Sequence, residues 1–220
     1  MVFTKKKLES ARKLTGQHCS VLVAQGIKDG IGITTFAIDS RFIGGSINVS
    51  SGEAITKACQ VAIDSKNPLI AWSEGGGQSM FESNLSLHMM TKTILAVNTL
   101  KSNKLPFINC YVNKCYGGIT ASFAGISDLA FAEESSMIGF AGQHIVKNQT
   151  REVLPDDFQS AKSLLKTGFV DAVYHRKEIN EKIIHILKIL LHQHNASSEV
   201  NKDPKNETSE NNQSLRTIAS

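Results

Sequence analysis

One pattern constrains the fold of this chain more than any other: an apolar run, a pair of glycines and then an amphipathic helical pattern, and it occurs twice. In the first copy, residues 68–72 lead into Gly76-Gly77, and a helical pattern begins after Met80. In the second copy, residues 106–112 lead into Gly117-Gly118, and helical spacing follows. Strands that alternate with helices in this way predict a layered α/β fold with a largely parallel sheet.

The glycine pairs predict a site for negative charge. Glycine has no side chain, so consecutive backbone N–H groups stay uncovered, and a helix that starts just beyond adds the positive end of its dipole. Such loops can stabilise a developing oxyanion. Close backbone packing is the competing interpretation, because paired glycines also occur in tight turns and at strand–helix crossings. Since parallel strands present their carboxyl-end loops at one edge, we place the site at that edge.

Length and composition indicate a single folded domain. A chain of 220 residues can bury a sizeable core unaided, and we expect the domain to span residues 1–194. Residues 195–220 are rich in Asn, Ser, Glu and Lys and predict a disordered polar tail. The net charge is +4, and the short basic run near the N-terminus predicts a solvated helix rather than nucleic-acid binding.

The sequence predicts a cytoplasmic protein, or a stromal one in a plastid lineage. No apolar run is long enough to span a bilayer, and the N-terminus lacks the apolar core of a signal peptide. The four cysteines have no C-x-x-C spacing, so we expect reduced core thiols rather than disulfides or a zinc site. They are Cys19, Cys59, Cys110 and Cys115.

Several further elements follow from local patterns. Residues 20–24 and 31–38 predict a hairpin, and Ser50 with Glu53 predicts a capping box at the start of the next helix. In the helix after Met80, the spacing predicts a buried apolar stripe of Leu87, Met90, Ile94 and Val97. Residues 4–14, 156–166 and 178–192 predict further helices.

Side chains capable of acid, base or nucleophile work form no convincing constellation. Ser73 and Ser79 lie near the first glycine pair and His88 lies on the following helix, which leaves a serine hydrolase as an alternative. His185, His192 and His194 predict solvated histidines rather than a metal site. Backbone donors without an evident acid or base suit a thioester whose α-carbon becomes carbanionic, because the enzyme then mainly has to hold the enolate oxygen. This points to acyl-CoA chemistry.

The residues around the glycine pairs carry a family resemblance over nearly all of residues 8–188. The chain resembles the carboxyltransferase β subunit of bacterial and plastid acetyl-CoA carboxylase, within the crotonase-like superfamily. The matching segments are residues 42–46, 73–82, 116–124, 132–133, 138–142 and 151–155, with Asp128 and Phe158. So many matches in one order make the resemblance specific.

The resemblance implies a crotonase-like β-β-α spiral and transfer of a carboxyl group from carboxybiotin on a carrier protein to acetyl-CoA, giving malonyl-CoA for fatty acid synthesis. Implied partners are the carboxyltransferase α subunit in an α₂β₂ assembly, biotin carboxyl carrier protein and biotin carboxylase. By resemblance, Gly117 and Gly118 hold the enolate, with Gly76 and Gly77 beside them. The implied substrate-binding residues are Gly44, Gly45, Met80, Phe140, Ala141 and Gly142.

Three departures from the family pattern keep other functions open. The four-cysteine zinc ribbon of the family is absent from these residues, so we predict no zinc in this chain. Gln78-Ser79 replaces the Ala-Arg of the family, and Gln143-His144 replaces its usual Pro-Arg or Arg-Arg. The alternatives are a decarboxylase or carboxyltransferase for another acyl thioester, and a β-like assembly subunit with weakened catalysis.

Overall fold

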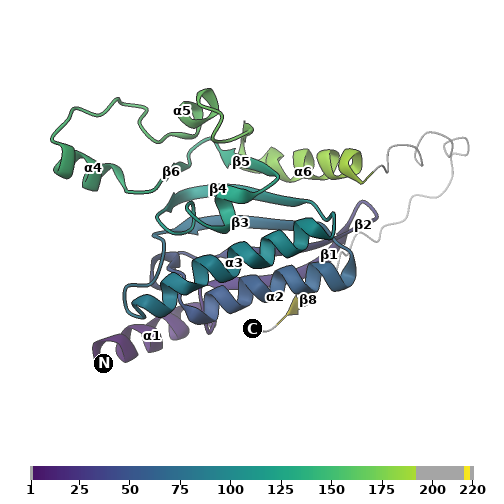
Figure 1. Cartoon of the computed structure of the whole chain (residues 1–220), viewed down its shortest axis with the longest axis horizontal. Coiled ribbons are helices and arrows are strands. Elements are labelled where there is room, and N and C mark those ends of the chain that lie inside the picture. Colours follow the sequence, from purple (N-terminus) through teal and green to yellow (C-terminus); the bar gives the residue numbers. More distant parts are fainter. Residues whose placement is uncertain (1, 192–215, 219–220) are drawn as a thin grey trace, which may run out of the picture.

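A computed structural model describes residues 2–191 and 216–218, which form a single mixed sheet with helices on both faces (Figure 1). The strands are β1 (Val21–Lys28), β2 (Ile31–Ile38), β3 (Leu69–Gly75), β4 (Phe107–Tyr116), β5 (Leu129–Glu133), β6 (Met137–Gly139), β7 (Ala172–Tyr174) and β8 (Arg216–Ile218). The helices are α1 (Val2–Thr15), α2 (Val49–Ser65), α3 (Asn84–Ser102), α4 (Gln143–Thr150), α5 (Ala161–Lys166) and α6 (Arg176–Leu190). Two short 3₁₀ turns are η1 (Ile43–Gly45) and η2 (Phe123–Ile126).

The sheet has the order β7-β5-β4-β3-β2-β1-β8, and β6 pairs with β4 beyond the end of β5. Strands β2, β3, β4, β5 and β7 are parallel, while β1 and β2 form the predicted antiparallel hairpin with Val21 opposite Ile38. The two strands that precede the glycine pairs, β3 and β4, are therefore neighbours, as the sequence predicts. Their carboxyl ends lie at one edge of the sheet, which brings the two glycine pairs together.

Two apolar cores lie on opposite faces of the sheet. Residues of β3 alternate between them: Leu69 and Ala71 pack with α2 and α3, and Ile70 packs with α6. Strands buried on both faces are expected for parallel sheets, and their near-continuous apolar runs explain why residues 68–72 and 106–112 are recognisable in the sequence. Figure 1 shows the same layers, with α2 and α3 together on one side and α6 on the other.

The structure corrects the predicted details of α2 and α3. Helix α2 begins after Asn48, whose side chain accepts a hydrogen bond from Ser51 N, so the predicted capping box of Ser50 and Glu53 is wrong. On α3 only Val97 of the predicted stripe is buried, and Leu87 is 52% exposed. The buried residues of α3 are Ser86, Thr93, Val97 and Leu100, with Met89 and Ala96 packed beside them.

The segment that follows β6 also differs from the prediction. Residues 143–150 form α4, which the sequence pattern does not indicate, and α4 contributes no buried residue. It lies at the far end of a stretch that extends away from the sheet (Figure 1). The predicted helix at residues 156–166 is shortened to α5, because turns occupy its first part.

Some predictions fall outside the described residues, namely His192, His194 and most of the tail at residues 195–220. Among the helices that the structure does describe, none combines the length and the apolar content needed to cross a membrane. The four cysteines are buried free thiols, as predicted.

Candidate active site

Three glycine loops meet at the carboxyl edge of the sheet: the N-terminal glycine loop (residues 44–45), the first glycine loop (residues 75–77) and the second glycine loop (residues 117–118). Gly76 N donates to Gly44 O at 3.1 Å. A Cβ atom built on Gly75 would lie 2.6 Å from Gly45 O, and one built on Gly77 would lie 2.9 Å from Gly118 N. The three backbones approach this closely only because none of these positions carries a side chain.

The amides of these loops divide into bonded and unbonded donors. Gly117 N donates to Phe140 O at 2.8 Å, and Gly76 N is held by Gly44 O. Among the described residues, none accepts a hydrogen bond from the N–H of Gly77 or Gly118. The expectation that Gly117 and Gly118 act as a donor pair therefore needs revision for Gly117. The two unbonded donors come one from each loop.

Helix dipoles contribute less at this edge than the sequence predicts. The second glycine loop is followed by turns and by η2, and no α-helix forms through Ala121 and Ala124. After the first glycine loop, α3 begins only at Asn84. The helix expected after Met80 is therefore confirmed but starts seven residues beyond Gly77, and the helix expected after the second pair is wrong. Any charge stabilisation comes from the N–H groups themselves.

A cavity of about 530 Å³ lies beside these loops. Its lining includes Gly44, Gly75 and Gly76 together with the polar residues Ser40, Glu74, Asn113, Lys114, Tyr116 and Ser135. A Cβ built on Gly44 or Gly76 would meet no atom within 4 Å, so these two glycines face open space rather than a packed neighbour. Close backbone packing explains why positions 75 and 77 must be glycine. Gly44 and Gly76 instead leave room for a ligand.

A polar cluster at the same edge, built on the two buried carboxylates Glu74 and Glu133, was not predicted from the sequence. Glu74 accepts from Ser40 N at 2.9 Å and from the side-chain amide of Asn113. Arg176 binds both oxygens of Glu133 at 2.7 Å and donates to Asn113 Oδ1 at 3.2 Å. The hydrogen bonds that Arg176 donates to the Glu133 carboxylate raise the pKa of the Arg176 guanidinium. Asn113, with φ of 49°, joins the two halves and ties β3, β4, β5 and α6 together.

The signal for this cluster is weak in the sequence. Glu74 directly precedes the glycine run at the end of an apolar strand, which is a position where a polar residue is worth noting. Glu133 and Arg176 are far apart in the chain, and no local pattern pairs them.

The remaining predicted binding residues lie in different settings. Phe140 is 71% exposed, and its carbonyl holds the second glycine loop. The carbonyl of Ala141 accepts from Gln159 Nε2 at 2.7 Å, and Gly142 precedes α4 with open space at its α-carbon. Met80 is 88% exposed and does not line the cavity beside the glycine loops.

The geometry gives no support to a serine hydrolase. The hydroxyl of Ser73 donates to Asn109 Oδ1 at 2.5 Å. Ser79 is buried, and no hydrogen bond joins it to His88, whose Nδ1 lies 2.6 Å from Asn84 O on its own helix. Neither serine is therefore activated by this histidine.

The replacement of the family alanine by Gln78 places a longer side chain against Gly118. A Cβ built on Gly118 would lie 2.6 Å from Gln78 Cγ. With its amide oriented to satisfy its neighbours, Gln78 donates to Ser86 O at 2.7 Å and to Ile47 O at 3.2 Å. Gln78 is thus held in place by two backbone carbonyls while its side chain lies directly against Gly118.

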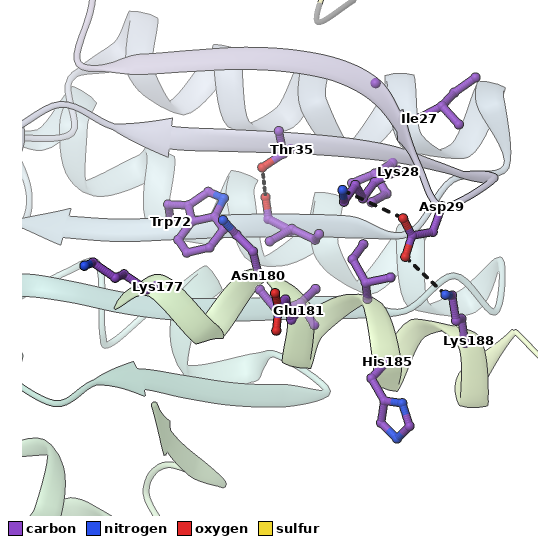
Figure 2. A pocket seen from close by; sticks show the side chains of 15 residues that line it. Ile27, Lys28, Asp29, Thr35, Trp72, Lys177, Asn180, Glu181, His185 and Lys188 are labelled. Atoms are coloured by element: carbon purple, nitrogen blue, oxygen red, sulfur yellow. Dashed lines mark hydrogen bonds and ion pairs between the residues drawn. The ribbon is translucent and has the colours of Figure 1, made fainter. Parts of the chain in front are cut away.

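A larger cavity of about 810 Å³ lies between the β1–β2 hairpin and α6. Figure 2 shows Trp72 and Asn180 at one end of it, and Asp29 at the other end between Lys28 and Lys188. None of the predicted site residues lines this cavity. Its size alone does not make it the active site, so we place the site at the glycine loops.

The chain is similar to known proteins both in sequence and in fold. The family model described as "Carboxyl transferase domain" matches residues 1–219. Among solved structures, the chain is similar to the Pseudomonas malonate decarboxylase hetero-dimer, with a TM-score of 0.67 and 21% identity over 81% of this chain and 83% of that one. It is also similar to transcarboxylase 12S with hydrolysed methylmalonyl-coenzyme A bound, with a TM-score of 0.68 and 20% identity over 77% of this chain and 33% of that one. These likenesses show the crotonase-like carboxyltransferase fold.

Two relatives carry the assignment further. The acetyl-coenzyme A carboxylase carboxyl transferase subunit beta of Pelagibacter ubique is 42% identical over 98% of this chain and 69% of its own length. The subunit of the same name from Bartonella quintana is 40% identical over 84% of this chain and 60% of its own length. The chain thus spans about two thirds of these relatives. By its match to the domain model and to these relatives, the chain belongs to the carboxyl transferase domain family, among the acetyl-coenzyme A carboxylase carboxyl transferase beta subunits.

Proposed function

We propose that this chain is the carboxyltransferase β subunit of an acetyl-CoA carboxylase, which transfers a carboxyl group from carboxybiotin to acetyl-CoA and yields malonyl-CoA for fatty acid synthesis. The observation that carries the proposal is the meeting of two unbonded backbone donors, Gly77 N–H and Gly118 N–H, where two glycine loops touch. This arrangement suits a reaction in which negative charge develops on one thioester oxygen.

The proposed roles follow from these positions. The thioester oxygen of acetyl-CoA accepts hydrogen bonds from the N–H of Gly77 and of Gly118. As the α-carbon loses its proton, the charge that forms on that oxygen strengthens both bonds, so the donors stabilise the transition state more than the substrate. The N–C bond between the ureido nitrogen of the substrate carboxybiotin and its carboxyl group breaks, the α-carbon bonds to that carboxyl carbon, and the freed ureido nitrogen takes the α-proton. Gly117 keeps its loop in place through Phe140 O rather than binding the enolate.

The acyl-CoA itself is proposed to lie along the open glycines. Gly44 and Gly76 leave space where other residues would place a Cβ, and the cavity beside them is large enough for the acyl end of the substrate. Gly45, which packs against Gly75, and Phe140, whose carbonyl holds Gly117, support this surface, and Ala141 and Gly142 directly follow Phe140 in the chain. The exposed Met80 is available to contact substrate or a partner.

Carboxybiotin is the second substrate of the proposed reaction, brought by a biotin carboxyl carrier protein that biotin carboxylase has charged in an ATP-dependent step. It supplies an activated carboxyl group. We assign its binding mainly to a carboxyltransferase α subunit in an α₂β₂ assembly. The names of the relatives, which describe a subunit of a larger carboxylase, support this partnership.

Reconstitution tests the proposal. The chain is mixed with an α subunit, biotin carboxylase, the biotin carrier, ATP, bicarbonate and acetyl-CoA, and malonyl-CoA is measured by mass spectrometry. We expect product only in the complete mixture, and omission of this chain should abolish it. Absence of malonyl-CoA from the complete mixture would rule the proposal out, and a panel of other acyl thioesters would then test the alternative substrates.

A second candidate function is that of a β-like subunit that assembles with the α subunit but has weakened catalysis, and one feature favours it. Ser79 is 5% exposed and occupies the position where the family has arginine. The site therefore lacks a fixed positive charge, and this buried position has little room for an arginine side chain. Under this second candidate, the chain binds the α subunit but the complete mixture forms no malonyl-CoA.

A further inference from the structure

Strand β4 leaves its regular pairing with β3 just before the second glycine loop. Ser73 of β3 lies opposite Tyr111 of β4, and Gly75 lies opposite Cys115. While β3 advances from 73 to 75, β4 advances from 111 to 115, so β4 carries a bulge. Asn113, inside the bulge, has a φ of 49°, in the left-handed region that residues other than glycine seldom adopt. Bulges change the direction of side chains and recur beside active sites, so this one indicates a functional use.

Beyond the bulge, Lys114 and Tyr116 both line the cavity beside the first glycine loop. Cys115, which lies between them in the chain, is fully buried, as the alternation of side chains along a strand requires. Residues 114–116 of β4 also pair with residues 137–139 of β6. With β3 on one side and β6 on the other, this backbone is fixed, and it holds the two side chains at the cavity.

The ammonium group of Lys114 is available to a ligand. Among the residues that the structure describes, none forms a hydrogen bond or an ion pair with it. Glu74 also lines this cavity but does not pair with Lys114, and its oxygens accept hydrogen bonds from Ser40 N at 2.9 Å and from the Asn113 side chain. The cavity therefore offers a positive charge to a ligand group that carries a negative one.

Tyr116 adds a neutral donor two residues further along the same strand. Its side chain is half-buried, and no residue in the described part of the chain forms a hydrogen bond with its hydroxyl group. Burial raises the pKa of Tyr116, and the neighbouring Cys115 thiol raises it further, so the phenol keeps its proton and can donate it. An ammonium group and a phenol O–H together suit the two oxygens of a carboxylate.

We propose that Lys114 and Tyr116 form a subsite for a carboxylate carried at the reacting end of the acyl group. Tyr116 directly precedes the second glycine loop, whose Gly118 N–H we assign to the thioester oxygen, and both residues line the cavity that we assign to the acyl end. The identity of the acyl group rests on the proposed function. In that reaction the carboxylate is the group that acetyl-CoA gains, so the subsite distinguishes malonyl-CoA from acetyl-CoA.

Calorimetry of the reconstituted complex with the α subunit tests the subsite, and the chain alone is titrated if no complex assembles. The two ligands, malonyl-CoA and acetyl-CoA, share coenzyme A and differ in the carboxylate. In Lys114→Met we expect the Kd of malonyl-CoA to rise about tenfold, because a charge-assisted contact is lost, while the Kd of acetyl-CoA stays the same. Tyr116→Phe removes one neutral donor and should raise the Kd of malonyl-CoA about fivefold.

Two further variants separate the loss of a contact from a change of fold. Lys114→Arg keeps the charge and should hold the Kd of malonyl-CoA within about threefold of the unmodified protein. The matched control is Lys57→Met, which removes an exposed lysine of α2 outside the lining of the cavity and should change neither Kd. Three results would overturn the proposal: an unchanged Kd of malonyl-CoA in Lys114→Met, an equal rise for acetyl-CoA, or an equal effect of Lys57→Met.

A variant that misfolds is replaced by a measurement on the unmodified protein. Acetoacetyl-CoA has a neutral methyl ketone where malonyl-CoA has its carboxylate. We expect malonyl-CoA to bind more tightly than acetoacetyl-CoA, and this preference should shrink at high salt, because Lys114 is exposed to water. Equal affinities at low salt, or no binding of malonyl-CoA at all, would also count against the subsite.

The binding measurement separates this inference from the proposed function. If the complete mixture makes no malonyl-CoA but the affinity for malonyl-CoA depends on Lys114, the function fails and the subsite stands. If malonyl-CoA forms normally and Lys114→Met leaves its Kd unchanged, the function stands and the subsite is wrong.

Discussion

Gly77 lies directly against Gly118, so that a Cβ atom on the first residue would come within 2.9 Å of the amide nitrogen of the second. This contact sets the spacing of the two donors that we assign to the enolate oxygen. It also makes Gly77 intolerant of any side chain, since its φ of 102° lies in a region that other residues rarely adopt.

Gly77→Ala should therefore lower both stability and turnover. The backbone strain costs about 1–3 kcal/mol of folding free energy. Displacement of the Gly118 amide removes a preorganised donor, for which we expect kcat to fall about a hundredfold or more. Urea unfolding and carboxyl-transfer kinetics measure the two effects. A variant with normal kcat would show that the enolate oxygen is held elsewhere.

Gly76→Ala gives the matched comparison one residue away. Its φ is not positive and its new methyl group meets no neighbour, so stability should stay within about 0.5 kcal/mol of the unmodified protein. Because the methyl group enters the space that we assign to acyl-CoA, the KM for acetyl-CoA should rise about tenfold. If KM is unchanged, substrate does not pass over Gly76.

The sequence was informative wherever the signal is local. Strands β3 and β4 are apolar runs because they are buried on both faces, and the glycines that end them mark where backbones meet. Local patterns failed on α3, where apolar residues lie on more than one side. Leu85, Leu87 and Leu95 are exposed while Met89 packs inward, so periodicity alone could not select the buried face.

Contacts between residues far apart in the sequence limit how much of the candidate site can be predicted from the sequence. The choice of Gly77 and Gly118 over Gly117 depends on Phe140, whose carbonyl takes the Gly117 N–H from a distant part of the chain. The pairing of Glu133 with Arg176 likewise requires the sheet and α6 to be assembled first. Neither relationship leaves a pattern in adjacent residues, so the sequence predicts the glycine loops but not which of their N–H groups are already hydrogen-bonded.

The Glu133–Arg176 pair predicts a measurable loss of stability. The Glu133 side chain is 11% exposed and receives two hydrogen bonds from Arg176, so Arg176→Ala leaves a mostly buried carboxylate without its cation. Because the arginine side chain is 58% exposed, water partly replaces it, and we expect a loss of about 1–2 kcal/mol in urea unfolding. The double variant Arg176→Ala/Glu133→Gln is the control and should recover part of this loss. If the effects of the two substitutions on the unfolding free energy simply add, the two side chains are not energetically coupled.

The buried thiols predict a decline of stability at alkaline pH. Burial raises the pKa of the Cys59 thiol from its ordinary value of 9.0 to about 12, and burial raises the pKa of Cys110 and Cys115 as well. Above pH 9 the unfolded chain loses these protons while the folded protein keeps them, so unfolding becomes coupled to proton release. Each such thiol then lowers the unfolding free energy by about 1.4 kcal/mol per pH unit until its folded-state pKa is reached.

Urea unfolding at pH 8 and at pH 10.5 measures this loss, and we expect the midpoint to fall clearly at the higher pH. Cys59→Ala isolates one contribution, because it removes a titrating group that is 1% exposed at the cost of only a small cavity. The variant should start less stable at pH 8 and lose less between the two pH values than the unmodified protein does. An identical loss in both proteins would mean that Cys59 does not titrate on unfolding, and that other groups, such as the buried Tyr111, cause the decline.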